Sequence, residues 1–124
     1  MKVLIADDDD ELRLLMSEYL SYAGFTVIDC ENGKVAWDKL QKEGADIAVL
    51  DINMPEMDGL ELLDNIRADA KLGELPVILI TAGSNKVDYA SATERGADDY
   101  LPKPLDYEVL IKHIKTLAEA FGKT

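Results

Sequence analysis

Short apolar runs, each typical of a β-strand, end at polar residues that can take part in chemistry. In chain order these are the carboxylates of Asp7 and Asp8, the carboxylate of Asp51, the hydroxyl of Thr81 and the ammonium of Lys103. In open α/β sheets, ligands bind outside the carboxyl ends of the strands. We therefore expect these side chains, drawn from four separate strand ends, to form one site.

The aspartates indicate a binding site for a divalent cation. Two unit charges about 4 Å apart repel by about 4 kcal/mol at an effective dielectric constant near 20. A folded domain tolerates Asp7, Asp8 and Asp51 together when a proton or a cation offsets this repulsion. Oxygen ligands from few side chains suit Mg²⁺. We assign the next two residues, Asp9 and Asp10, to the start of a helix, where acidic side chains complement the helix dipole.

The same residues suit phosphoryl transfer. A carboxylate such as that of Asp51 can act as a nucleophile and form an acyl phosphate. Phosphoryl transfer depends mainly on positioning and on neutralising charge at the phosphate oxygens. A metal supplies part of that charge, the Lys103 ammonium a second cation, and the Thr81 hydroxyl a hydrogen bond.

The elements that position these residues alternate between two patterns. Nearly continuous apolar runs, typical of strands covered on both faces, lie at residues 3–6, 25–28, 47–50 and 77–80, with a weaker one at 99–101. Helical periodicity is expected at about residues 12–23, 33–43, 60–66, 85–96 and 107–121. Asn32 and Asp106 are candidate N-caps. Five consecutive βα units predict an open, doubly wound α/β fold with a five-stranded parallel sheet.

Composition limits the class of protein. The chain has 124 residues, of which 48% are hydrophobic, and a formal net charge of −12. We expect one domain over residues 1–124 with no output domain. The acidic balance argues against binding to nucleic acid or an anionic membrane surface. No apolar run approaches the roughly 18 residues that a membrane span requires. The single Cys30 excludes an internal disulfide, and we expect a cytoplasmic protein.

Four motifs together give a specific resemblance. From Lys2 to about Phe121 the chain resembles the receiver domain of two-component response regulators, in its single-domain, chemotaxis-regulator-like form. The matching segments are Val3-Leu-Ile-Ala-Asp-Asp8, Leu50-Asp-Ile-Asn-Met-Pro-Glu-Met-Asp-Gly59, Ile80-Thr-Ala82 and Asp99-Tyr-Leu-Pro-Lys-Pro104. The resemblance implies a flavodoxin-like (βα)₅ fold with strand order 2-1-3-4-5.

The resemblance also implies a function in phosphorelay signal transduction. Asp51 matches the phosphoacceptor, which takes a phosphoryl group from a sensor histidine kinase or phosphotransfer protein. Asp8 matches the direct metal ligand, and Asp7 the acidic partner that reaches the metal through water. Asn53 matches the position whose backbone carbonyl completes the metal shell. The implied cofactor is Mg²⁺, with Mn²⁺ as an alternative ion. The implied protein is a signalling phosphoacceptor and not a turnover enzyme.

Further residues match the family's switch. Thr81 and Lys103 match the phosphate-binding hydroxyl and lysine, and Tyr100 the switch aromatic. Asn53 and Gly83 occupy positions that affect phosphoryl lifetime, and the missing side chain at Gly83 suggests rapid self-dephosphorylation. The implied output is contact with a downstream protein target through the face formed by the fourth helix, fifth strand and fifth helix.

Three alternatives belong to other functional classes. A haloacid-dehalogenase-like phosphatase has an aspartate nucleophile after its first strand, which Asp7 and Asp9 imitate, but Asp10 and Glu11 stand where small turn residues belong. A flavodoxin-like cofactor protein needs a first loop that accepts a flavin phosphate, which four aspartates repel. A receiver-shaped module that binds its partner without phosphate is the third.

Overall fold

Strands and helices alternate along the whole chain. The structure, a computed structural model, describes residues 1–81 and 86–123. The strands are β1 (Lys2–Ala6), β2 (Thr26–Cys30), β3 (Ile47–Asp51), β4 (Val77–Thr81) and β5 (Asp99–Pro102). The helices are α1 (Asp10–Tyr22), α2 (Gly33–Lys42), α3 (Gly59–Ala68), α4 (Lys86–Glu94) and α5 (Tyr107–Ala120). All five predicted βα units are therefore present.

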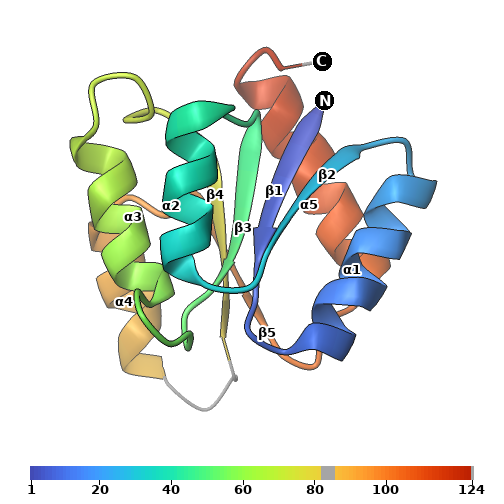
Figure 1. Ribbon diagram of the computed structural model, residues 1–124, viewed down its shortest axis with the longest axis horizontal. Helices are drawn as coiled ribbons and strands as arrows, with labels where there is room; N and C mark the ends of the chain where they lie inside the picture. Colours follow the sequence, from blue (N-terminus) through green and yellow to red (C-terminus); the bar gives the residue numbers. More distant parts are fainter. Residues whose placement is uncertain (82–85, 124) are drawn as a thin grey trace.

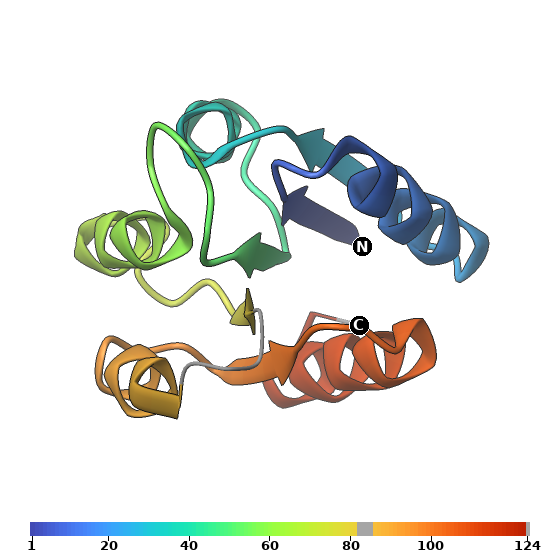
Figure 2. The ribbon, with the colours of Figure 1, turned by 90° about the horizontal axis from the view of Figure 1, so that it is seen from below.

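The five strands form one parallel sheet in the order β2-β1-β3-β4-β5, which confirms the predicted doubly wound topology. Helices α2, α3 and α4 cover one face of the sheet, and α1 and α5 cover the other (Figure 1). The view from below shows the sheet between these two helical layers (Figure 2). Among the helices of the described residues, none has both the length and the apolar character needed to cross a membrane.

Successive side chains of each strand point to opposite faces of the sheet, so each strand contributes to the core on both faces. In β1, Leu4 and Ala6 pack into the cluster beneath α2, α3 and α4, whereas Val3 and Ile5 pack into the cluster beneath α1 and α5. All four side chains are buried, with relative exposures of 0–1%. Because successive strand residues point to opposite faces, a strand covered on both sides needs an unbroken apolar run. This explains the sequence pattern that predicted the strands.

Capping side chains begin the helices where the sequence predicts. Asn32 and Asp106 accept hydrogen bonds from backbone N–H groups of α2 and α5, which confirms both predicted N-caps. Asp9 caps α1 and Asp58 caps α3 in the same way. A cap of this kind contributes about 1 kcal/mol to helix stability. The assignment of Asp9 to the helix start, and not to the site, is therefore correct.

The second strand lies slightly later than predicted. It was expected at residues 25–28 and is found at Thr26–Cys30. Asp29 and Cys30 extend it by pairing with Ile5 and Ala6 of β1. Pairing with a central strand outweighs the weak intrinsic β propensity of aspartate.

Candidate functional site

Two carboxylates face each other across neighbouring strands. Ala6 pairs with Leu50, so Asp7 and Asp51 lie at the same level, one residue beyond that pair. Alternation also places both on the face covered by α1 and α5, because Ile5 and Val49 lie there. Asp7 is completely buried and Asp51 is 2% exposed.

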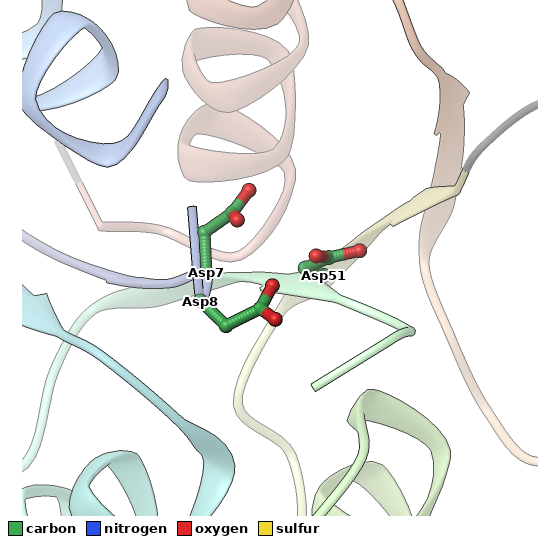
Figure 3. A group of neighbouring side chains, drawn as sticks. All are labelled: Asp7, Asp8 and Asp51. Atoms are coloured by element: carbon green, nitrogen blue, oxygen red, sulfur yellow. The ribbon is translucent and has the colours of Figure 1, made fainter. Parts of the chain in front are cut away.

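Asp8 completes an acidic cluster with these two residues. Figure 3 shows the three side chains gathered where β1 and β3 end. One carboxylate oxygen from each of Asp7, Asp8 and Asp51 lies within 4.8 Å of the others, and the Asp8 side chain is exposed. Such a set of hard oxygen ligands, open to solvent on one side, fits a hydrated Mg²⁺ ion. The predicted convergence of these three aspartates is confirmed.

The described residues neutralise the charge of this cluster only in part. Burial, followed by the negative charge of Asp7, raises the pKa of Asp51 to about 6 from its ordinary value of 3.8. Lys103 and the Asn53 backbone N–H act in the opposite direction and do not compensate fully. Within the described residues, Asp7 Oδ2 is buried and accepts no hydrogen bond, although it forms an ion pair with Lys103. A buried acceptor in this condition is unusual and indicates room for a further electropositive ligand.

Lys103 brings an ammonium group to the cluster. Its Nζ lies 3.3 Å from Asp51 Oδ2 and 3.5 Å from Asp7 Oδ2. Burial lowers the pKa of Lys103, but the two carboxylates raise it by more, so the net shift is upward and the side chain stays charged. Its backbone N–H donates to the Thr81 carbonyl oxygen at 2.6 Å, which ties the residue after β5 to the end of β4.

The loop after β3 holds Asp51 in place. The Asn53 backbone N–H donates to Asp51 Oδ1 at 3.2 Å. A side chain at Gly59 would place its Cβ 2.4 Å from the Asp51 carbonyl oxygen, so only glycine permits this approach. The amino end of α3, which is the positive end of the helix dipole, therefore begins directly against the backbone of Asp51.

Thr81 and Tyr100 lie on the other face of the sheet. Leu79 pairs with Tyr100, and both pack into the cluster beneath α2, α3 and α4. Alternation places Thr81 on the face of Leu79 and Tyr100, while Lys103 shares the face of the carboxylates. Tyr100 is only partly buried. Gly83, predicted to affect phosphoryl lifetime, lies outside the described residues.

Arg13 was missed by sequence reasoning. No motif includes it, yet its guanidinium donates to the Asp7 carbonyl oxygen at 2.7 Å and forms ion pairs with Asp10 and Asp29. One signal was available: a cation near the amino end of a helix opposes the helix dipole, so its presence in α1 suggests a specific partner.

Comparison with known proteins agrees with the geometry. The family model described as "Response regulator receiver domain" matches residues 3–115. Chemotaxis protein CheY1 of Helicobacter pylori is 37% identical, with 94% of this chain and 96% of that protein covered. The transcriptional regulatory protein GltR of Pseudomonas aeruginosa is 41% identical over 93% of this chain, which spans about half (48%) of GltR's length.

A solved structure extends the likeness to three dimensions. It is the signal receiver domain of a signal transduction histidine kinase from Syntrophus aciditrophicus, which is 32% identical to this chain. The TM-score is 0.91, and the superposition covers 99% of this chain and 93% of that one. The fold is thus shared almost completely.

Proposed function

This chain belongs to the family of response regulator receiver domains and acts in phosphorelay signalling, and we propose that Asp51 is its phosphoacceptor. The observation that carries the proposal is the convergence of Asp51 with Asp7 and Asp8, with the Lys103 ammonium 3.3 Å from Asp51 Oδ2. A buried carboxylate with its own cation and an adjacent set of oxygen ligands is suited to accept a phosphoryl group.

The acceptor reaction follows from these positions. An Asp51 carboxylate oxygen attacks the phosphorus of a phosphohistidine, so an O–P bond forms as the N–P bond breaks and the imidazole leaves with a proton from solvent. Mg²⁺, or Mn²⁺, when held by Asp7, Asp8, Asp51 and the Asn53 backbone carbonyl, supplies positive charge to the phosphoryl oxygens. Lys103 Nζ, already within ion-pair distance of Asp51, neutralises another phosphoryl oxygen.

The switch uses the opposite face of the sheet. A phosphoryl group on Asp51 would accept a hydrogen bond from the Thr81 hydroxyl, which draws the end of β4 toward the site. Thr81 shares its face with Tyr100, so this shift would change the packing available to the Tyr100 ring. The altered surface is that of α4, β5 and α5, through which the domain would contact a downstream protein target. Such a response is a shift in population between two conformations.

The remaining proposals concern how the domain works in the cell. It would take its phosphoryl group from a sensor histidine kinase or phosphotransfer protein in the cytoplasm, and it would bind no nucleic acid itself. Asn53 and Gly83 would set the phosphoryl lifetime. Residues 1–124 would form one domain that promotes its own phosphorylation and dephosphorylation without sustained turnover. The comparisons give no support to the phosphatase alternative.

The test is the intact mass after treatment with acetyl phosphate, with Mg²⁺ and with excess chelator. We expect one phosphoryl adduct that needs the metal and is absent from the Asp51→Asn variant. Asp38→Asn, at an exposed position on α2, is the matched control and should still form the adduct. Absence of any adduct on the folded protein would instead support a module that binds without phosphate. Sustained turnover of a phosphate ester would revive the phosphatase.

A further inference from the structure

The Arg13 side chain links three segments beside the acidic cluster. Its Nη1 donates to the Asp7 carbonyl oxygen at 2.7 Å, its Nη2 donates to Asp10 Oδ1 at 2.7 Å, and its Nε pairs with Asp29 Oδ1 at 2.5 Å. These partners lie after β1, in the first turn of α1 and in β2, respectively. The side chain is 14% exposed. Arg13 therefore fixes how the chain passes from β1 into α1.

The contact with Asp7 bears directly on the direction of Asp8. The Asp7 carbonyl and the Asp8 N–H belong to one planar peptide unit, so an anchor on the carbonyl orients the whole unit. The Asp7 N–H is already held by the Cys30 carbonyl at 3.2 Å, and Asp7 Oδ1 accepts from the Asp9 N–H at 2.9 Å. The Arg13 hydrogen bond adds a third contact to the stretch of backbone that carries the exposed Asp8 side chain.

The two aspartates hold the guanidinium in position. Burial lowers the pKa of Arg13, but Asp10 and Asp29 more than offset it, so the net shift is upward and the charge is secure. A planar guanidinium offers donors in fixed directions, so Nη1 and Nη2 each donate to a separate acceptor while Nε lies within ion-pair distance of Asp29. A lysine ammonium keeps the charge but does not hold its donors in these fixed directions.

We propose that Arg13 is a positioning residue that orients the Asp7–Asp8 peptide unit and thereby sets the affinity of the acidic cluster for a divalent cation. The inference rests on the proposed function, because it presumes that Asp7, Asp8 and Asp51 hold that cation. Groups that orient metal ligands commonly change metal affinity by 10- to 100-fold when they are removed.

Electrostatics alone predicts the opposite result. Arg13 is a cation near the site, so its removal would reduce repulsion of Mg²⁺ and leave Asp10 and Asp29 with uncompensated negative charge. Both changes would tighten metal binding. Positioning predicts weaker binding. The sign of the change therefore distinguishes the two roles.

The experiment is a calorimetric titration of the full chain with Mg²⁺ alone. We compare the wild type with Arg13→Ala and Arg13→Lys, and with Arg67→Lys as the matched control. Arg67 also donates to backbone carbonyls and pairs with an aspartate, but it packs against the chain before β4 and before β5, away from the acidic cluster. Thermal unfolding by circular dichroism is recorded for every variant.

We expect Arg13→Ala to raise the dissociation constant for Mg²⁺ about tenfold. Arg13→Lys should give an intermediate value, because it keeps the charge and can reach one acceptor. Arg67→Lys should lower the melting temperature while its Mg²⁺ affinity stays within about twofold of the wild type. If Arg13→Ala does not fold, the comparison of Arg13→Lys with Arg67→Lys decides the question.

The outcomes separate this inference from the proposed function. If the wild type binds Mg²⁺ and forms the Asp51 adduct, but the Arg13 variants bind with equal or greater affinity, positioning by Arg13 is overturned and the acceptor function stands. If the wild type shows neither Mg²⁺ binding nor a metal-dependent adduct, both proposals fail. Weaker binding in the Arg13 variants alone supports the inference.

Discussion

Two groups of charged side chains lie within this fold, and they are satisfied to very different degrees. In the first, Arg67 of α3 donates twice to the Gly96 carbonyl and once each to those of Gly73 and Leu75, and it pairs with Asp98 at 2.9 Å. These contacts join α3 to the segments before β4 and β5. Each of the three guanidinium nitrogens therefore donates at least one hydrogen bond.

The second group is the acidic cluster, where charges outnumber partners. Within the part of the chain that the structure describes, Asp7, Asp8 and Asp51 have one ammonium beside them, that of Lys103. The pKa of Asp51 is raised to about 6, because burial and repulsion by Asp7 destabilise its ionised form more than Lys103 and the Asn53 N–H stabilise it. A group like that of Arg67 stabilises the fold, whereas unsatisfied buried charge is retained where it binds or reacts. We therefore assign a structural role to the fully hydrogen-bonded Arg67 and a functional role to the acidic cluster. Four predictions test this assignment.

Loss of the Arg67 network should have the largest effect. In Arg67→Ala three backbone carbonyls and Asp98 lose a charged donor. At about 1 kcal/mol for each of these four partners, the free energy of unfolding should fall by about 4 kcal/mol. Urea denaturation measures this change.

The control for this variant is Arg95→Ala. Arg95 forms an exposed ion pair with Asp64 at 3.8 Å, and its removal should cost less than about 0.5 kcal/mol. Arg67→Ala should still form the Asp51 adduct at a temperature where it is folded. Loss of the adduct from the folded variant would contradict a purely structural role for Arg67.

Neutralising Asp51 should stabilise the metal-free protein. Its pKa is raised from 3.8 to about 6 in the folded state, so the ionised carboxylate destabilises the fold above pH 6 by about 3 kcal/mol. Asp51→Asn should therefore raise the free energy of unfolding by up to about 3 kcal/mol at pH 7.5. The gain should shrink as the pH falls from 6 toward 4, because the folded-state carboxyl becomes protonated while the pH approaches the unfolded-state pKa of 3.8.

The measurement is urea denaturation in chelator at several pH values between 4 and 7.5. Asp38→Asn removes one exposed carboxylate and serves as the control, with no comparable gain expected. A gain that does not depend on pH would show that the Asp51 charge is not the source of the destabilisation.

Mg²⁺ should stabilise the wild type by relieving the same repulsion. At a free Mg²⁺ concentration about thirtyfold above the dissociation constant, the free energy of unfolding should rise by about 2 kcal/mol. Asp8→Asn removes an exposed cluster ligand and should lose most of this increment. Thermal unfolding with and without Mg²⁺ measures it, and equal stabilisation of both proteins would place the metal elsewhere.

The smallest effect concerns the loop beside the cluster. Glu56 has φ 69°, in the left-handed region where a side chain is disfavoured. Glu56→Gly should raise the free energy of unfolding by about 0.5 kcal/mol. Glu56→Gln keeps the side chain but removes the charge, so it should show no such gain. If Gln stabilises as much as Gly, charge repulsion and not backbone strain is the cause.

Much of the structure could be predicted because its causes are local. Unbroken apolar runs require strands covered on both faces, and Asn32 and Asp106 cap helices with their own side chains. The convergence of Asp7 and Asp51 also followed, since parallel strands end at one edge of the sheet. By contrast, the ion pair of Arg13 with Asp29 could not be predicted in this way, because Arg13 lies in α1 and Asp29 in β2.

The alternation of strands and helices, the residues at the strand ends and the family resemblance can all be recognised in the amino-acid sequence, because each depends on residue types at short spacing. Which charges are compensated depends instead on the folded arrangement. Asp51 ends β3 and Asp98 directly precedes β5. Asp51 lies beside two other carboxylates and a lysine, whereas Asp98 receives hydrogen bonds from Arg67 and the Val77 N–H. Burial and Coulomb energy depend on distances between residues far apart in the chain, and these exist only once it has folded.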